Sequence, residues 1–472
     1  MVFSSNLFLF IFLPVTLAGY YLINEKLRNA FLLMMSLAFY AWGEPRAVLV
    51  MLASIVVNYT FGLAIHELKE WNAGVLIRRL VLFLVVAANL GILFYYKYLD
   101  FAIGTINGMF GTNMALRNIA LPIGISFFTF QGMSYVLDLY MDKGTVQKNP
   151  LNVALYIALF PQLIAGPIVR YADVNEQIMH RTVNVDMFAE GVRRFAVGLA
   201  KKAFLANTLG QVADQIFDQP VFSGTAGVAW LGAVCYAFQI YFDFSGYSDM
   251  AIGLGRMFGF DFLENFNYPY ISSTITEFWR RWHISLSSWF RDYVYIPLGG
   301  NRRGNQYLHQ LTVFLLTGLW HGASWNFVLW GLWHGAFLMA EKPFIKKGLM
   351  KKIPAWVRWP FTMLIVLVGW VLFRMEDLPG TLHYLGVMFG LVHAERVTYT
   401  ASWYLTGWVV FALVIAVLAS VPWRKVFGRI GEHWAKDGLG LVVSHLWTAF
   451  LLAFSLMLCM TSTYNPFIYF RF

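Results

Sequence analysis

Apolar runs about as long as a bilayer is thick recur along the whole chain, and they restrict the possible fold more than any other feature. A helix needs about 20 mostly apolar residues to cross the hydrocarbon core. Backbone N–H and C=O groups in lipid must pair inside the protein, so such runs form α-helices. Only 13% of the 472 residues are charged, against about 25% in soluble proteins. The sequence therefore predicts an all-α, multi-pass integral membrane protein.

We expect about eleven membrane-spanning helices, with interfacial or re-entrant helices between some of them. No charged stretch is long enough to bury a core of its own, and the longest runs from Lys342 to Arg358. We therefore expect residues 1–472 to form a single membrane domain. The predicted spans are Val2–Leu22, Ala30–Trp42, Ala47–Ile65, Leu80–Tyr95, Ile119–Leu137, Asn152–Val169, Val228–Phe244, Leu311–Leu338, Trp359–Phe373, Trp403–Leu418 and Leu441–Met460.

Basic residues gather in the loops after the first, third and fifth spans, and the positive-inside rule places such loops in the cytoplasm. The N-terminus is then outside, and the first run stays as a membrane helix because it lacks a basic n-region and an A-x-A cleavage pattern. This topology explains the net charge of +10, so no nucleic-acid partner is expected. The loop residues are Lys26, Arg28, Lys69, Arg78, Arg79, Lys143 and Lys148.

His321 lies near the middle of the span LTVFLLTGLWHGASWNFVLWGLWHGAFL, residues 311–338. Ionisable groups at membrane depth usually face a cavity or a reaction centre, and histidine exchanges its proton near neutral pH. His321 is therefore the best catalytic candidate, although it could also be a buried histidine bonded to a neighbouring helix. On a continuous helix His334 would lie about 20 Å away, so we expect it near the membrane interface in a structural role.

The segment from Tyr268 to Gly304 is too polar to span and too aromatic for a simple loop, which favours a pair of amphipathic helices at the interface or dipping partway in. Its arginines, which include Arg280 and Arg281, could bind phosphates in bidentate geometry or merely anchor lipid headgroups. His283 would share a helical face with Trp279 and Ser287. It is a second active-site histidine or an interfacial one.

Asp243 stands at the end of an apolar run, in QIYFDFSGYSDMAIG, residues 239–253. A carboxylate at such depth tends to be paired or to line a wet cavity, so it could orient a histidine, hold a substrate group or serve the structure alone. Cys235 and Cys459 are the only cysteines and lack the spacing of a disulfide framework or a zinc site. No metal site is expected, and no nucleotide-binding or HExxH motif occurs.

Several long motifs resemble the membrane-bound O-acyltransferase (MBOAT) family, and most closely its alginate-acetylating branch. They are FWRRWHISLSSWFRDYVYIPLGGNRRG (278–304) and LTGLWHGASWNFVLWGLWHG (316–335), with MVFSSNLFLFIFLPV, PIGISFFTFQGMSYVLDLY, FPQLIAGPIVRY and PFIYFRF elsewhere. The resemblance covers essentially the whole chain. It implies spans around a central tunnel, with His321 as the near-invariant histidine of the family and His283 as the second active-site position.

The resemblance also implies acetyl-CoA as the donor, entering from the cytoplasm, with no permanently bound cofactor. We expect a multi-pass protein of the bacterial inner membrane, in contact with membrane lipid, that works with a periplasmic acetyltransferase partner on alginate, bacterial cellulose or peptidoglycan. An acetyl conduit or transporter without its own chemistry, and a structural subunit of an export complex, are the alternatives.

Each candidate residue receives a role in this interpretation. His321 would act as general base, and His283 would orient the thioester or the acceptor. Other residues would bind substrate or shape the tunnel: Arg280 and Arg281 at the CoA phosphates, Trp320 and Trp325 along the tunnel wall, and Asn326 and Asp243 at substrate groups.

Overall fold

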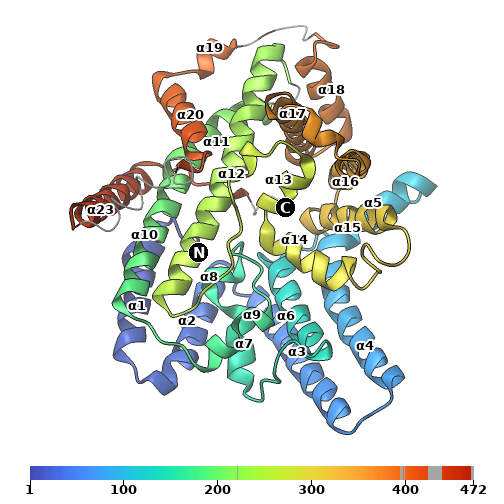
Figure 1. Ribbon diagram of the computed structural model, residues 1–472, viewed down its shortest axis with the longest axis vertical. Helices are drawn as coiled ribbons and strands as arrows, with labels where there is room; N and C mark the ends of the chain where they lie inside the picture. The colour runs from blue at the N-terminus through green and yellow to red at the C-terminus, as the bar shows by residue number, and fades with distance from the viewer. Residues whose placement is uncertain (220–221, 394–396, 398, 424–437, 469–472) are drawn as a thin grey trace. The chain divides into compact units, whose positions relative to one another are not determined.

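The computed structural model describes residues 1–219, 222–393, 397, 399–423 and 438–468 (Figure 1). These residues form helices joined by loops and contain no strand. They pack into two compact units, and the boundary passes through helices α10 (Val185–Ala200) and α12 (Ala226–Met257). The first unit is Met1–Phe195 with Met250–Leu263, and the second is Ala196–Asp249 with Glu264–Phe472. The single domain predicted for residues 1–472 stays a prediction.

The first unit holds the N-terminal helices around a cluster of phenylalanine rings. Phe12 and Phe160 lie 5.3 Å apart between ring centroids, and Phe39 packs against both. Its elements are η1 (Phe8–Phe12), α1 (Leu13–Leu22), η2 (Glu25–Leu27), α2 (Arg28–Gly43), α3 (Ala47–Glu70), α4 (Val75–Leu93), η3 (Phe94–Tyr98), α5 (Leu99–Phe110), α6 (Ile125–Tyr140), α7 (Pro150–Ala158), α8 (Phe160–Leu163) and α9 (Tyr171–Met179).

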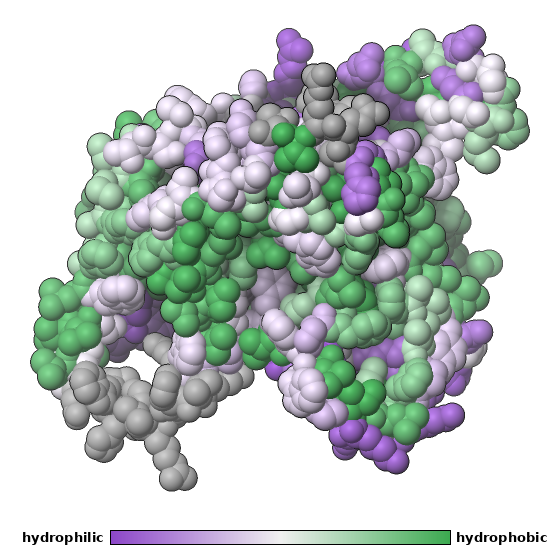
Figure 2. Space-filling model, turned by 90° about the horizontal axis from the view of Figure 1, so that it is seen from above, coloured by the Kyte–Doolittle hydropathy of each residue, from purple (hydrophilic) through white to green (hydrophobic). Residues whose placement is uncertain are grey.

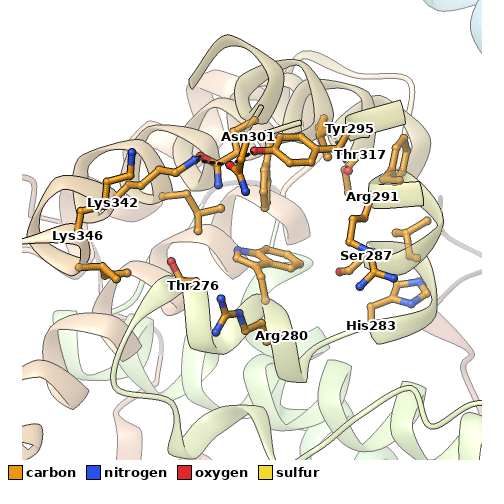
Figure 3. A pocket seen from close by; sticks show the side chains of 18 residues that line it. Thr276, Arg280, His283, Ser287, Arg291, Tyr295, Asn301, Thr317, Lys342 and Lys346 are labelled. Carbon is orange, nitrogen blue, oxygen red and sulfur yellow. Dashed lines mark hydrogen bonds between the residues drawn. The ribbon is translucent and has the colours of Figure 1, made fainter. Parts of the chain in front are cut away.

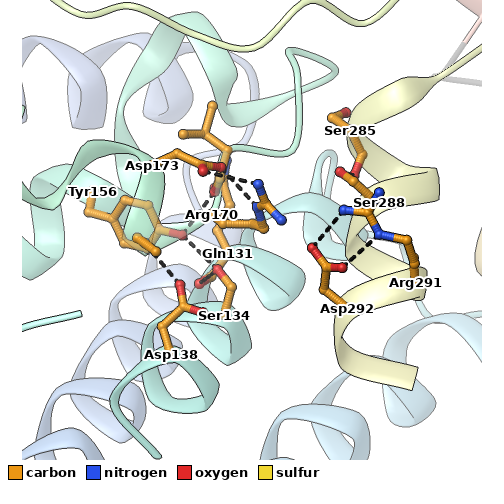
Figure 4. Close-up of polar contacts among 12 residues, drawn as sticks. Gln131, Ser134, Asp138, Tyr156, Arg170, Asp173, Ser285, Ser288, Arg291 and Asp292 are labelled. Carbon is orange, nitrogen blue, oxygen red and sulfur yellow. Dashed lines mark hydrogen bonds and ion pairs between the residues drawn. The ribbon is translucent and has the colours of Figure 1, made fainter. Parts of the chain in front are cut away.

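Buried hydrogen bonds fix the ends of several helices in this unit. Lys69, at the end of α3, donates to the main-chain oxygens of Leu139 and Tyr140 at the end of α6. The C-terminal ends of α3 and α6 thus lie side by side. Tyr156 donates to the main-chain oxygen of Val169 and exchanges a 2.7 Å hydrogen bond with Ser134 (Figure 4).

The second unit contains both candidate histidines. Its elements are η4 (Lys201–Ala206), α11 (Asn207–Phe217), the first part of α12, η5 (Pro269–Ile271), α13 (Ile275–Arg281), α14 (Ile284–Phe290), η6 (Arg291–Tyr295), α15 (Gln306–His321), α16 (Trp325–Lys346), η7 (Leu349–Lys352), α17 (Ala355–Arg374), α18 (Leu378–Met388), α19 (Ala401–Tyr404), α20 (Gly407–Ala419) and α23 (Gly438–Thr461).

Five of the described helical segments are long and apolar enough to cross a membrane, which confirms the predicted class: Ala47–Glu70, Val75–Phe110, Ala226–Met257, Ala355–Arg374 and Gly438–Thr461. Hydrophobic residues cover wide areas of the face shown in Figure 2, as expected of a surface in lipid. The total of eleven spans stays a prediction. The predicted run Asn152–Val169 is wrong as a continuous helix, because α7 ends at Ala158 and α8 begins at Phe160.

The predicted span Leu311–Leu338 is also wrong as one helix, and its break shapes the site. Helix α15 ends at His321, Gly322 is extended (φ −161°, ψ 154°), and α16 begins at Trp325. The two helices then pack backbone to backbone. A Cβ added to Gly318 would lie 2.3 Å from the main-chain oxygen of Phe327, and one added to Gly331 would lie 2.5 Å from that of Phe314.

These contacts generate a stability prediction. Gly331→Ala places a methyl group against rigid backbone, so it should separate α15 from α16 and lower the free energy of unfolding by about 1–3 kcal/mol. Gly335→Ala is the matched control, since its Cβ would first meet a flexible atom, Leu311 Cδ1, at 3.2 Å. Thermal unfolding in detergent measures the difference, and equal Tm values for the two variants would contradict the packing described.

Candidate active site

The fold brings the two candidate histidines together in the second unit. His321 closes α15, and His283 lies in the break between α13 and α14. Their ring centroids are 6.4 Å apart, and the residues are 6% and 1% exposed. Two imidazoles at this separation form a candidate catalytic pair.

His283 does not continue a helix, so the predicted helical face shared with Trp279 and Ser287 is wrong. Its backbone is left-handed (φ 43°, ψ 55°), a conformation that few non-glycine residues adopt outside functional or strongly held positions. Nδ1 lies 3.1 Å from Oδ1 of Asn265, and Nε2 is buried with no hydrogen-bond partner among the described residues. Burial lowers the pKa of His283 to about 3, so the ring is neutral at physiological pH.

Aromatic rings enclose both imidazoles. Trp320 lies 5.0 Å from the His321 ring and 6.0 Å from the His283 ring, and its predicted place on a tunnel wall stays a prediction. Phe244 of α12 packs edge-on against His283 at 4.6 Å. Trp330 contacts His321 at 5.3 Å. Such walls exclude water, which favours the neutral form of an imidazole.

A cavity of about 420 Å³ opens beside His283. Four basic residues line it, and the described lining residues include no aspartate or glutamate. Figure 3 shows Lys342 and Lys346 on one side of the cavity and His283 on the opposite side. The basic lining residues are Arg280, Arg291, Lys342 and Lys346, and hydroxyl or amide side chains come from Thr276, Ser287, Thr317, Asn301 and Gln310. The cavity is therefore suited to an anion.

The side chains of the adjacent residues Arg280 and Arg281 lie in different surroundings. Arg280 lines the cavity, and no ion pair or hydrogen bond engages its side chain within the described ranges. Arg281 forms an ion pair with Glu277 at 2.8 Å and also donates to the main-chain oxygen of Asn267. The guanidinium of Arg281 therefore holds α13 to the preceding loop, a contact that differs from the predicted binding of the CoA phosphates. Arg291, also on the cavity wall, pairs with Asp292 (Figure 4).

Asp243 does not orient a histidine. The carboxylate is 2.8 Å from Nζ of Lys202, and both side chains are almost fully buried. Its other oxygen accepts a 2.8 Å hydrogen bond from the main-chain N–H of Ile468, and Lys202 also donates to the main-chain oxygen of Pro466. These contacts favour the structural interpretation of Asp243, since they anchor the segment around Ile468 to α12.

Trp325 and Asn326, at the start of α16, differ in exposure and in their contacts. Trp325 is 52% exposed at the start of α16, which differs from a place on a tunnel wall. Asn326 is buried and donates to the main-chain oxygen of Met375 and to the hydroxyl of Thr381. These bonds tie α16 to the start of α18, so the amide has a structural contact that differs from the predicted substrate binding.

His334 is fully buried, which agrees with a structural role, and its expected depth near the membrane interface stays a prediction. The ring packs at 5.0 Å against both Trp279 and Trp330, and neither ring nitrogen has a hydrogen-bond partner among the described residues. A Cβ on Gly369 would come within 2.5 Å of Nε2. His334 therefore acts as a packing residue behind the site.

Sequence reasoning missed Asn265, Lys342 and Lys346. Asn265 stands in a polar and aromatic loop where no periodicity marks it, and only its contact with His283 reveals it. The two lysines follow an apolar helix and resemble ordinary topology signals. Their i, i+4 spacing on one face of α16 was the available sign of a shared surface. Within the described residues, no group of three or more His, Cys, Asp or Glu could hold a metal ion.

The chain is similar to known proteins, and the matched region includes this site. The model of the membrane-bound O-acyltransferase family matches residues 142–358, which include both histidines. The probable alginate O-acetylase AlgI of Pseudomonas putida is 42% identical over 500 residues, across 100% of both chains. Its counterpart from Pseudomonas aeruginosa is 46% identical over 444 residues, or 91% of this chain and 83% of that protein.

This chain belongs to the membrane-bound O-acyltransferase family. The peptidoglycan O-acetyltransferase of Helicobacter pylori is 36% identical over 427 residues, or 83% of this chain and 80% of that protein. As a member of the MBOAT family the protein is an O-acyltransferase, and its apolar helices make it a multi-pass membrane protein. The roles of individual residues stay predictions.

The different surroundings of the two histidines of the α15–α16 hairpin predict different mutant phenotypes. His334→Leu replaces a ring that makes no described hydrogen bond, so it should retain acyltransferase activity and abundance. His321→Leu is the matched change at the centre and should lower activity by at least about 100-fold, since general-base help is worth about 10²- to 10⁴-fold. O-acylation normalised to membrane-fraction abundance is the measurement. Loss of activity in His334→Leu alone would reverse the assignment.

Proposed function

We propose that this protein moves acetyl groups from cytoplasmic acetyl-CoA across the bacterial inner membrane for O-acetylation of an exported polysaccharide. The observation that carries the proposal is the meeting of His283 and His321 beside a cavity lined by basic residues. An imidazole pair suits proton transfer at a thioester, and the basic wall suits the phosphates of CoA. The similarity to probable alginate O-acetylases supports alginate as the acceptor.

The charge of the cavity supports a donor site on the cytoplasmic side. Lys342 and Lys346 lie at the C-terminal end of α16, and Lys347, Lys351 and Lys352 follow directly. The positive-inside rule assigns such a basic cluster to the cytoplasm. Phosphates there would meet Arg280 and the lysines, and the acetyl end would extend toward His283.

The reaction requires two proton transfers and one acyl transfer. A hydroxyl oxygen of the acceptor attacks the thioester carbonyl carbon as His321 accepts the hydroxyl proton. The C–S bond then breaks, CoA leaves as its thiolate, and His321 returns the proton to sulfur. The products are the acetate ester and free CoA. Transfer of the acetyl group through a covalent acetyl-histidine is a variant with the same overall balance.

The proposal also covers the final acceptor of the acetyl group and a partner protein. A periplasmic acetyltransferase would complete transfer to the polymer. Peptidoglycan is a second acceptor candidate, favoured by the 36% identity to a peptidoglycan O-acetyltransferase, and bacterial cellulose is a third. An acetyl conduit without chemistry would share the membrane helices but would not need a buried histidine pair.

Arg280 lines the cavity and Arg281 does not, so changes at the two residues should affect the binding of acetyl-CoA differently. Arg280→Gln should raise the KM for acetyl-CoA by about tenfold or more, because a charged hydrogen bond is worth about 1.5–3 kcal/mol. Arg281→Gln is the matched control and should leave that KM within about twofold, since it loses a partly exposed ion pair outside the cavity lining. Equal effects of the two changes on KM would contradict the cavity as donor site.

The acetyltransferase proposal is tested with purified protein in nanodiscs and no partner present. The protein should bind acetyl-CoA and slowly release free CoA, because water or a small hydroxyl compound can replace the acceptor. This release should vanish in His321→Ala while CoA binding persists. Passage of acetyl groups that survives His321→Ala would support a conduit, and absence of both binding and cleavage in folded protein would overturn the proposal.

A further inference from the structure

Asn265 connects three parts of the polypeptide that meet at His283. It lies in the loop after α12 and is 1% exposed. Its Nδ2 donates to the hydroxyl of Ser248 on α12 at 3.1 Å. Its Oδ1 is 3.2 Å from the main-chain N–H of Ser285 in α14 and 3.1 Å from Nδ1 of His283. Its own main-chain oxygen accepts from the N–H of Ile284 at 2.9 Å.

These contacts determine which way the side-chain amide of Asn265 faces. A main-chain N–H can only donate, so the atom that faces Ser285 N must be the oxygen. The hydroxyl of Ser285 adds a second donor at 2.9 Å. The nitrogen then faces Ser248, whose hydroxyl can accept. The reversed amide would place two N–H groups against each other at Ser285.

The amide orientation in turn determines the tautomer of His283. Because Oδ1 of Asn265 can only accept, Nδ1 of His283 must carry the hydrogen. In a neutral imidazole the other nitrogen, Nε2, then carries the lone pair and can only accept. Nε2 is buried and meets no hydrogen-bond partner among the described residues, and the residue borders the cavity.

We infer that Asn265 is a positioning residue that holds His283 as the Nδ1–H tautomer, so that Nε2 accepts a hydrogen bond from a hydroxyl group of the acceptor. The inference rests on the proposed acetyl transfer and narrows it. An accepting Nε2 cannot donate to the thioester carbonyl, so His283 orients the acceptor and not the donor.

The surroundings support a fixed ring. The left-handed backbone of His283 (φ 43°) costs free energy unless neighbouring contacts hold it. Bonds from Asn265 to residues 283, 284 and 285 supply that restraint, and the ring of Phe244 packs against the imidazole face-to-edge. The titratable and charged groups near the ring are His321, at 6.4 Å between centroids, and the cavity residues Arg280 and Arg291.

The test combines a spectroscopic readout with kinetics. Solid-state NMR of ¹⁵N-histidine-labelled protein in nanodiscs separates protonated from unprotonated ring nitrogens, and the His283 signals are those lost in His283→Gln. Wild-type protein should show Nδ1 protonated and Nε2 unprotonated. Asn265→Ala should populate the other tautomer and lower kcat for transfer to a small hydroxyl acceptor by about tenfold or more, with an unchanged KM for acetyl-CoA.

Two further variants keep the test decisive if Asn265→Ala folds poorly. Asn265→Asp retains an acceptor for Nδ1–H, so the tautomer should persist. Its negative charge should raise the pKa of His283, and activity should then fall at a higher pH than in wild type as the solution is acidified. Asn267→Ala changes an exposed asparagine in the same loop and should alter neither the spectrum nor kcat.

The outcomes separate this inference from the proposed function. An unprotonated Nδ1 in wild-type protein, or unchanged spectrum and kcat in Asn265→Ala, would overturn the role of Asn265. The expected tautomer in a protein that never cleaves acetyl-CoA would leave Asn265 as the residue that fixes His283 and would overturn the acetyl-transfer proposal alone.

Discussion

The backbone contact between α15 and α16 is the constraint on which the site depends. Gly318 and Gly331 let main chain approach main chain, so the polypeptide can reverse at Gly322. A break in a membrane-embedded helix exposes backbone groups that lipid cannot satisfy. Such a break is tolerated where protein surrounds it, and here it ends α15 at His321. Because of this reversal, the imidazole of His321 lies in the protein interior. The helices before and after the break, α15 and α16, are both largely apolar.

The sequence predicted the class of fold and the two histidines, because hydropathy and a polar residue inside an apolar run are local signals. It could not predict the helix break. GLWHGASW reads as apolar and continuous, and the close approach that makes the reversal possible depends on atoms of Phe327 and Phe314 across the hairpin. The same break brings His334 back beside Trp279 and Trp330, a packing position that a straight helix through residues 311–338 does not reveal.

The sequence also could not predict which groups the polar side chains contact. Arg280 and Arg281 are chemically identical neighbours, yet a helix turns successive side chains by about 100°, so one reaches the cavity and the other reaches Glu277. Because Asp243 stands at the end of an apolar run, it was a reasonable candidate to contact a histidine. The structure gives that position to Asn265, a neutral side chain, which leaves His283 without a neighbouring carboxylate that would raise its pKa.

The buried pair of Lys202 and Asp243 also sets an order of assembly. Asp243 accepts its backbone hydrogen bond from Ile468, which is synthesised 225 residues later. Two charges at such depth are costly until their remaining polar partners arrive. Helix α12, which carries Phe244 against His283, therefore reaches its final state only after nearly the whole described chain has left the ribosome. Protein that stops short of this segment would lack the main-chain partners that Asp243 and Lys202 find at Ile468 and Pro466.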